Sequence, residues 1–195
     1  MTPKQAERLR TKITNIKRTL AAERRKFGGY DDSRGLRYLP VKYFVRLQDY
    51  KGGLTYLRWF AKNFPDDRGY PDFLFEWTII LHQTGKSREA AGMAFRTFCA
   101  NTYLFDKFFG RPAIPVEKWE GSNLETPEFT EYFDYSCSQE VLAGFSAWLE
   151  QLINMEEFKV LSEKYIQIQT RLKTERDQET RGYLIRQASQ LKKFL

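Results

Sequence analysis

The chain has 195 residues and a formal net charge of +7; 42% of its residues are hydrophobic, 16% are aromatic and 29% are charged. This length and apolar content suit one domain with a well-buried core, and they exclude an intrinsically disordered chain. No run of about 18 apolar residues is present and the first twenty residues carry charges throughout, so we expect neither a membrane span nor a signal region and predict a soluble, cytoplasmic protein.

The positive charge is unevenly placed along the chain. Residues 1–40 carry 11 Lys and Arg against 4 Asp and Glu, whereas residues 106–137 carry 3 against 7. The chain therefore begins with a basic segment and contains an acidic one further on, and each could attract a partner of opposite charge.

The first predicted element is a basic amphipathic helix within residues 1–29. Thr2 is a candidate N-cap, and Pro3 suits the first helical position. An apolar stripe at helical spacing follows, made of Leu9, Ile13, Ile16, Leu20 and Phe27. Gly28 and Gly29 end the helix, and the cations just before them suit the negative end of the helix dipole.

Two helical hairpins are predicted over residues 34–104. In the first hairpin the arms are residues 36–47 and 50–64, and Pro65 ends the second arm because proline cannot extend a helix. In the second hairpin the arms are residues 73–82 and 88–100, separated by a short polar turn. The two hairpins can be laid over each other, which indicates an internal repeat.

Residues 105–137 form an acidic connector, rich in aromatic residues and proline, that interrupts the repeat. We expect a group of aromatic side chains to hold it against the helices: Phe108, Phe109, Trp119, Phe129 and Phe133. Residues 138–195 return to the helical pattern, as a third hairpin and a closing helix. Within that hairpin, Asn154 with Glu157 resembles a capping box.

The predicted fold is therefore all-α: one domain over residues 1–195, in which antiparallel helix hairpins stack as a short solenoid between the first helix and a carboxy-terminal helical cap. The paired arms resemble the tetratricopeptide repeat. The residues that match in the first unit are Phe44, Asp49, Tyr50, Gly53, Leu57 and Pro65, and those in the second are Trp77, Leu81, Gly85, Ala90 and Phe98. The sequence departs from that pattern at Val41 and Thr78, where the family usually has a small residue, and in the 37-residue spacing from Gly53 to Ala90.

The resemblance implies a concave face, lined by the first helix of each pair, that binds an extended peptide or a helix of another protein. Carried onto this sequence, the partner-binding residues are Tyr38, Lys42, Arg46, Phe75, Ile79, His82 and Gln83. Cations beside aromatic residues suit an acidic peptide with an aromatic or aliphatic anchor. The leading hypothesis is a non-enzymatic adaptor that binds another protein.

The alternative hypothesis is a nucleic-acid-binding helical protein that uses its first helix. The candidate contacts are Lys12, Lys17, Arg18, Arg24, Arg25 and Lys26. A protein that neutralises several phosphates gains an affinity that falls steeply with salt. A solvated polar face of an amphipathic helix would explain the same residues without nucleic-acid binding. A further hypothesis is that the acidic connector folds back over this helix.

The sequence contains no recognisable catalytic centre. His82 is the sole histidine and has no nucleophile or second ligand at a characteristic spacing, which argues against a catalytic triad and a metal site. A pocket built from Asp31, Asp32, Glu76 and His82 would need the fold to gather them, and nothing in the pattern selects it. Two cysteines indicate neither a disulfide framework nor a zinc cluster. We therefore expect no enzyme activity, cofactor or metal.

Overall fold

The computed structural model describes residues 1–30 and 35–192 of the chain. The described residues form an all-α fold without β-strands, which confirms the predicted fold class. Their α-helices are α1 (Pro3–Phe27), α2 (Leu39–Leu47), α3 (Tyr50–Asn63), α4 (Pro71–Gln83), α5 (Ser87–Ala100), α6 (Leu104–Phe108), α7 (Ala143–Asn154), α8 (Glu156–Thr174) and α9 (Gln178–Leu191). Short 3-10 helices lie at Asn123–Glu125, Pro127–Tyr132 and Glu140–Leu142.

Helix α1 has the ends that its sequence predicts. The Thr2 side chain accepts a hydrogen bond from the Gln5 backbone N–H at 3.3 Å, and the Gln5 side chain accepts one from the Thr2 backbone N–H at 2.8 Å. Gly28 ends the helix with φ of 71°, a left-handed conformation that glycine adopts without strain. The prediction that Phe27 lies on the buried stripe is wrong, because its side chain is 63% exposed.

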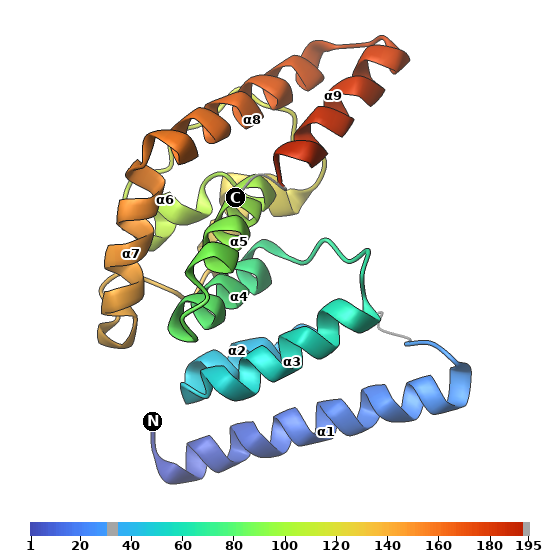
Figure 1. Cartoon of the computed structure of the whole chain (residues 1–195), viewed down its shortest axis with the longest axis vertical. Coiled ribbons are helices and arrows are strands. Elements are labelled where there is room, and N and C mark those ends of the chain that lie inside the picture. The colour runs from blue at the N-terminus through green and yellow to red at the C-terminus, as the bar shows by residue number, and fades with distance from the viewer. Residues whose placement is uncertain (31–34, 193–195) are drawn as a thin grey trace.

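The helices stack along the long axis of the molecule (Figure 1). Helix α1 lies at one end and packs on α2, which packs on both α3 and α4. Helix α3 also packs on α4, and α4 pairs with α5. The third hairpin, α7 and α8, packs on α4 and α5 respectively, and α9 packs on α8 at the other end. Successive hairpins thus share one hydrophobic core, while a tetratricopeptide-like solenoid stays a prediction.

A glycine lets α3 approach its neighbours closely. A Cβ atom added to Gly53 would lie 2.6 Å from Ile80 Cδ1 and 3.2 Å from Phe44 Cβ, which is tighter than normal carbon contacts. The backbone of α3 therefore fits against α2 and α4 because position 53 has no side chain. The turn before α3 is also local in origin, since the Asp49 side chain accepts a hydrogen bond from the Gly52 N–H at 2.9 Å.

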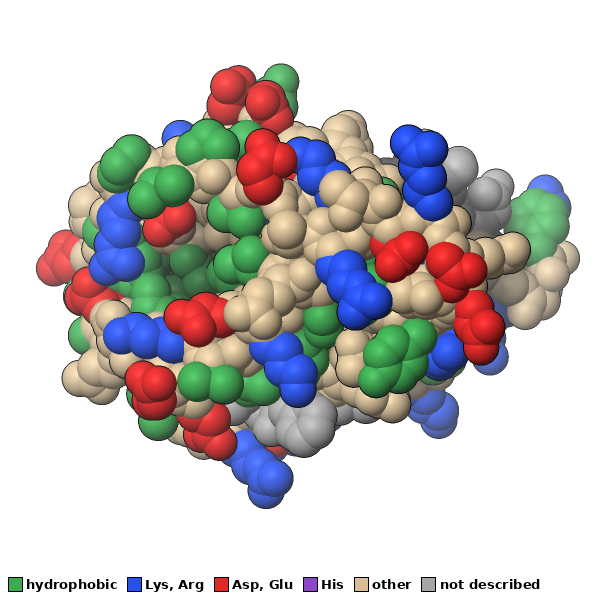
Figure 2. Space-filling view, turned by 90° about the horizontal axis from the view of Figure 1, so that it is seen from above, with side chains coloured by type: hydrophobic (Ala, Val, Ile, Leu, Met, Phe, Trp, Pro, Cys, Tyr) green, Lys and Arg blue, Asp and Glu red, His purple; other side chains and the backbone are tan. Residues whose placement is uncertain are grey.

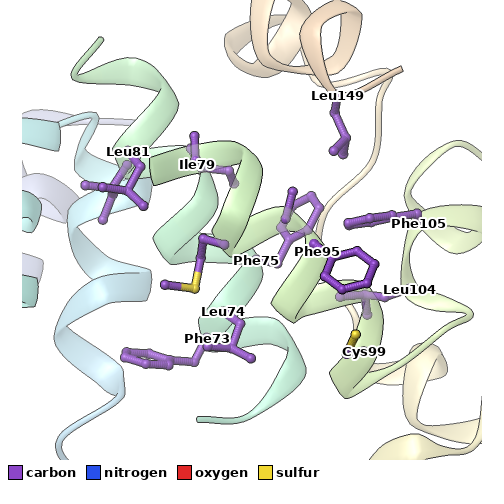
Figure 3. Close-up of a cluster of buried hydrophobic side chains, with 14 of the residues drawn as sticks. Phe73, Leu74, Phe75, Ile79, Leu81, Phe95, Cys99, Leu104, Phe105 and Leu149 are labelled. Atoms are coloured by element: carbon purple, nitrogen blue, oxygen red, sulfur yellow. The ribbon is translucent and has the colours of Figure 1, made fainter. Parts of the chain in front are cut away.

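Aromatic side chains of the connector pack into the hydrophobic core. Phe108 and Phe133 are buried, and the other three aromatic side chains expected to hold the connector pack against the same core. The centre of this region is Phe75 of α4, whose ring centroid lies 5.0 Å from that of Phe108 and 5.5 Å from that of Phe145. Figure 3 shows Phe75 among side chains of several helices, including Phe105 and Leu149. The expectation that aromatic residues pin the connector is confirmed.

The carboxy-terminal helices follow the predicted plan except at one cap. Asn154 does not cap α8: its side-chain amide donates to the Glu150 carbonyl oxygen at 2.9 Å, within the preceding helix. Met155 stands at the N-cap position and makes no side-chain hydrogen bond there. Helix α9 is capped by Asp177, whose side chain accepts a hydrogen bond from the Thr180 backbone N–H at 2.8 Å.

Candidate functional site

The predicted partner-binding face is only partly open: Tyr38 and Lys42 line a hollow of about 340 Å³, while other residues of the face are buried. Phe75 and Ile79 are both 0% exposed, which corrects the expectation that they face a partner. Tyr38 is half-buried, and its hydroxyl group donates to the Asp67 carboxylate at 2.8 Å. Its burial beside that carboxylate raises the pKa of the Tyr38 hydroxyl group. Phe75 and Ile79 therefore belong to the core, whereas Tyr38 keeps part of its surface at the hollow.

The two cations of that face are paired with the chain's own connector. Asp134 Oδ2 lies 2.7 Å from Lys42 Nζ and 3.2 Å from Arg46 Nη2. The hydrogen bond from Lys42 lowers the pKa of Asp134. Beside it, the ring centroid of Phe133 lies 4.9 Å from that of Phe75. The segment around Asp134 therefore lies on the part of α2 and α4 where an acidic peptide with an aromatic anchor was expected.

His82 and Gln83 lie at the carboxy-terminal end of α4, where α7 covers the histidine. The His82 ring centroid lies 4.7 Å from that of Trp148 and 5.6 Å from that of Phe145. Burial lowers the pKa of His82, and its Nδ1 atom has no hydrogen-bond partner among the described residues. Gln83 is partly exposed. His82 is therefore covered by α7, whereas Lys42 and Arg46 are paired with Asp134 of the connector.

The acidic side chain of Glu76 lies inside the protein. Glu76 is 3% exposed, and the Tyr135 hydroxyl group donates to its Oε1 atom at 2.8 Å. Burial raises the pKa of Glu76 to about 8, and Asp72 one turn earlier adds to the effect. Sequence reasoning named Glu76 only with His82, Asp31 and Asp32, and the last two lie outside the described residues. The sequence offers one signal for its burial, because Glu76 is the one charged residue within the apolar run 73–81.

The six cations proposed for nucleic-acid binding fall into three places. Lys17, Arg18, Arg24 and Arg25 line one groove between α1 and α3. Lys12 lies in another hollow with Arg8 and Arg46, and its Nζ atom lies 5.7 Å from the Tyr43 ring centroid. Lys26 lies over the exposed Phe27 ring at 4.9 Å. The structure therefore brings four of the six together.

The groove between α1 and α3 has a volume of about 770 Å³. Its lining is cationic on the α1 side and aromatic on the other: Lys17, Arg18, Ala21, Arg24, Arg25, Tyr30, Thr55, Tyr56, Trp59 and Asn63. Helical spacing explains the cationic row, because positions 17, 18, 21, 24 and 25 share one flank of α1. No carboxylate lines the groove within the described part of the chain.

Aromatic rings form a continuous cluster in this groove. The Trp59 ring centroid lies 5.8 Å from that of Tyr30 and 5.2 Å from that of Tyr56. Lys17 Nζ lies 5.8 Å from the Tyr56 ring centroid, so cation and aromatic faces meet directly. Trp59 and Tyr30 are each partly exposed, and they present apolar ring surface between the cations.

A polar network holds Arg24 across the groove. Its Nη1 atom donates to Asn63 Oδ1 at 2.7 Å and to the Tyr30 hydroxyl oxygen at 3.1 Å. The Tyr30 hydroxyl group donates to the same Asn63 oxygen at 2.8 Å, and the Asn63 amide donates to the Trp59 carbonyl oxygen at 2.7 Å. Arg24 is thus fixed by α3, whereas Lys17, Arg18 and Arg25 form no ion pair with any described residue.

The net charge of the whole chain resides on α1. This helix carries nine Lys and Arg against two Glu, a net charge of +7 that equals that of all 195 residues. At the opposite end of the molecule, Figure 2 shows Lys and Arg side chains interspersed with Asp and Glu. The positive field is therefore concentrated along one edge of the stack.

The acidic connector is paired elsewhere. Glu117 forms an ion pair with Lys173 of α8, Glu120 with Lys118, and Asp134 with the two cations of α2. Within residues 1–30 and 35–192, no ion pair joins the connector to α1. The hypothesis that the connector folds back over the basic helix is therefore wrong for its described charges, and the groove stays open.

Residues 1–30 and 35–192 contain neither a candidate metal site nor a candidate membrane-spanning helix. No group of three or more His, Cys, Asp or Glu side chains there is arranged to hold a metal ion. None of the helices in these ranges has the length and apolar character needed to cross a membrane.

No protein-family model matches the chain, and no curated protein or solved structure is significantly similar to it.

Proposed function

We propose that this protein binds single-stranded nucleic acid in the groove between α1 and α3. The observation that carries the proposal is the lining of this groove, where four cations of α1 accompany the partly exposed rings of Trp59 and Tyr30. Proteins that bind single strands combine a positive groove that follows the phosphates with aromatic rings on which bases stack.

The arrangement favours a single strand over a duplex. Bases of a single strand can turn toward Trp59 and Tyr30, whereas in a duplex they are paired and stacked. Lys17, Arg18 and Arg25, which form no ion pair within residues 1–30 and 35–192, can follow phosphates, and the fixed guanidinium of Arg24 can orient one. The open volume of about 770 Å³ accommodates more than one nucleotide unit.

The proposal assigns binding and no chemical reaction. It requires no cofactor, because phosphate neutralisation and stacking use only side chains of α1 and α3. Cys99 and Cys137 are both free thiols, which suits the cytoplasm as the place of action.

Replacement of Lys17, Arg18 and Arg25 by glutamine should weaken binding of a fluorescent single-stranded oligonucleotide by roughly tenfold to a hundredfold at low salt. Arg24 is kept because it holds α1 to α3. Each phosphate contact contributes about 0.7 to the salt slope for single strands, so removing three contacts should make the slope shallower by about 2. Fluorescence anisotropy over a salt series measures both quantities.

The matched control removes the same charge at the other end of the molecule. Lys159, Lys164 and Arg186 are exposed on α8 and α9, and their replacement by glutamine should leave both affinity and slope unchanged. Equal losses in the two triple variants would show that only net charge matters and would reject the groove. A duplex or an abasic oligomer should bind more weakly than the single strand, and displacement of the oligonucleotide by polyglutamate at equal charge would instead indicate an acidic peptide.

A second candidate function is the recognition of an acidic peptide by another face, the one formed by Lys42 and Arg46. What supports it is the chain's own segment, because Asp134 already bridges these two cations and Phe133 packs beside them. A partner with the same chemistry would take the place of Asp134. This second candidate is the adaptor function expected from the sequence. It requires the partner to displace Asp134 of the connector from Lys42 and Arg46.

The replacement Asp134→Asn should increase binding of a synthetic peptide of residues 129–136, because it frees both cations while Phe133 and Tyr135 stay in place. Adding Lys42→Ala and Arg46→Ala should remove the gain. Isothermal titration calorimetry measures the binding, and Lys51→Ala with Lys62→Ala on exposed positions of α3 is the control for charge. Unchanged affinity in the Asp134→Asn protein would argue against a peptide site here.

A further inference from the structure

A second hollow lies far from α1, where α5, α8 and α9 meet the connector. Its volume is about 450 Å³, within the range of small-molecule sites. Its apolar lining comes from separate helices: Leu74 of α4, Leu172 of α8, and Ile185 and Ala188 of α9. The hollow therefore exists only in the folded stack.

Three cations line this hollow. Arg68, Arg96 and Lys192 form no ion pair with any residue in the described part of the chain. Arg96 is partly buried, and burial lowers the pKa of its guanidinium. A guanidinium removed from water without an anion is unfavourable, so the fold carries a cost that an anionic ligand would offset.

Arg96 and Lys192 line this hollow together with Cys99. Burial raises the pKa of the Cys99 thiol to about 12, and the positive charges of Lys192 and Arg96 partly offset that rise. The only carboxylate in the lining is Glu125, and its Oε2 atom already accepts the Gly121 backbone N–H at 3.0 Å. Within the described lining, positive charge is thus in excess.

A buried amide oxygen in the same lining lacks a hydrogen bond. Gln169 of α8 is 6% exposed, and its Oε1 atom has no hydrogen-bond partner within the described residues. The backbone of Gln169 is well held, since its carbonyl oxygen accepts the Trp119 N–H at 2.9 Å. Buried polar atoms in folded proteins nearly always have a partner, so this oxygen points to a missing donor.

We infer that this hollow binds a small amphipathic organic anion. The carboxylate or phosphate group of the ligand would lie against Arg96 and Lys192, and its apolar body against Leu172 and Ala188. A hydroxyl or amide group on the ligand would donate to Gln169 Oε1. This inference is independent of the nucleic-acid proposal, because the hollow shares no lining residue with the groove of α1 and α3.

The test uses four probes and the full chain. Octanoate and octyl phosphate carry both an anion and an apolar chain, inorganic phosphate lacks the chain, and octanol has the chain and a neutral hydroxyl group but lacks the anion. Calorimetry and thermal melting should show saturable 1:1 binding of octanoate, octyl phosphate or both, with a raised melting temperature. Inorganic phosphate and octanol should each bind at least about tenfold more weakly, because one half of the recognition is absent. Equal binding of octanol or of inorganic phosphate would overturn the inferred ligand class.

Replacement of Arg96 by methionine tests the assignment of the site. It keeps an apolar stem and removes the uncompensated charge, so the ligand-free protein should melt no lower than the wild type, while affinity for the probe that binds should fall about tenfold or more. Arg88→Met changes an exposed arginine on the same helix and should leave affinity unchanged. The triple glutamine variant of α1 should also bind the probe normally. Undiminished affinity in the Arg96→Met protein, or loss in the α1 variant, would rule out this hollow.

Discussion

Replacement of Glu76 by glutamine should flatten the pH dependence of stability and raise the free energy of unfolding by a few kcal/mol at pH 8. The carboxyl group has a folded-state pKa of about 8, against 4.5 for an ordinary glutamate. Between these pH values the native protein keeps a proton that the unfolded chain has released, so wild-type stability falls as pH rises, by up to about 1.4 kcal/mol per pH unit. Above pH 8 both states are ionised and the loss is complete.

Glutamine at position 76 can retain the hydrogen bond from Tyr135, but it has no carboxyl proton to release. Its side-chain oxygen can still accept the Tyr135 hydroxyl proton, and its volume matches that of glutamic acid. The wild type and the variant should therefore be nearly equal at pH 4.5 and separate as pH rises. The charged groups that act on Glu76, namely Asp72, Lys42 and Arg46, are present in both proteins, so the difference between the two curves reports the removal of the Glu76 carboxyl group.

Urea denaturation at half-unit steps from pH 4.5 to 8.5 measures this difference. The control is Glu163→Gln, on an exposed position of α8, which should follow the wild-type curve. Parallel curves for the wild type and the Glu76 variant would mean that Glu76 reaches water and ionises normally in the native protein.

Replacement of Phe75 by alanine should lower the free energy of unfolding by about 3–5 kcal/mol, the range measured for large-to-small changes at buried aromatic positions. Phe75 is 0% exposed and contacts rings of α6, the connector and α7, so its loss leaves a cavity where three segments meet. Because a domain of this size is stable by only about 5–15 kcal/mol, the variant should be close to unfolding.

Chemical denaturation with far-ultraviolet circular dichroism measures this loss. Tyr132→Ala removes an aromatic side chain from the same connector at a position that is 82% exposed, and it should change stability by less than about 0.5 kcal/mol. A small effect of Phe75→Ala, similar to that of Tyr132→Ala, would show that the connector is only loosely attached and that the face of α4 is open to a partner.

The local features of this protein could be predicted because their physical causes lie within a few residues. The all-α class follows from apolar spacing, and the end of α1 follows from a left-handed glycine at position 28. The small side chain required at position 53 could also be anticipated, since the repeat pattern placed a glycine where helices approach. The errors at Phe27 and Asn154 are limited to helix ends, where periodicity alone does not say whether another element covers a side chain.

The candidate sites needed the tertiary structure. The sequence identified the cations of α1 but could not show that four of them face Trp59 across a groove, because that depends on the packing of α1 beside the second hairpin. Nor could it show that Asp134 pairs with Lys42, that Phe75 is core, or that Arg96 shares a hollow with Gln169. Helix formation and capping depend on neighbours within about four residues, whereas these sites depend on contacts between residues distant in the chain, which are decided by how whole helix faces fit together.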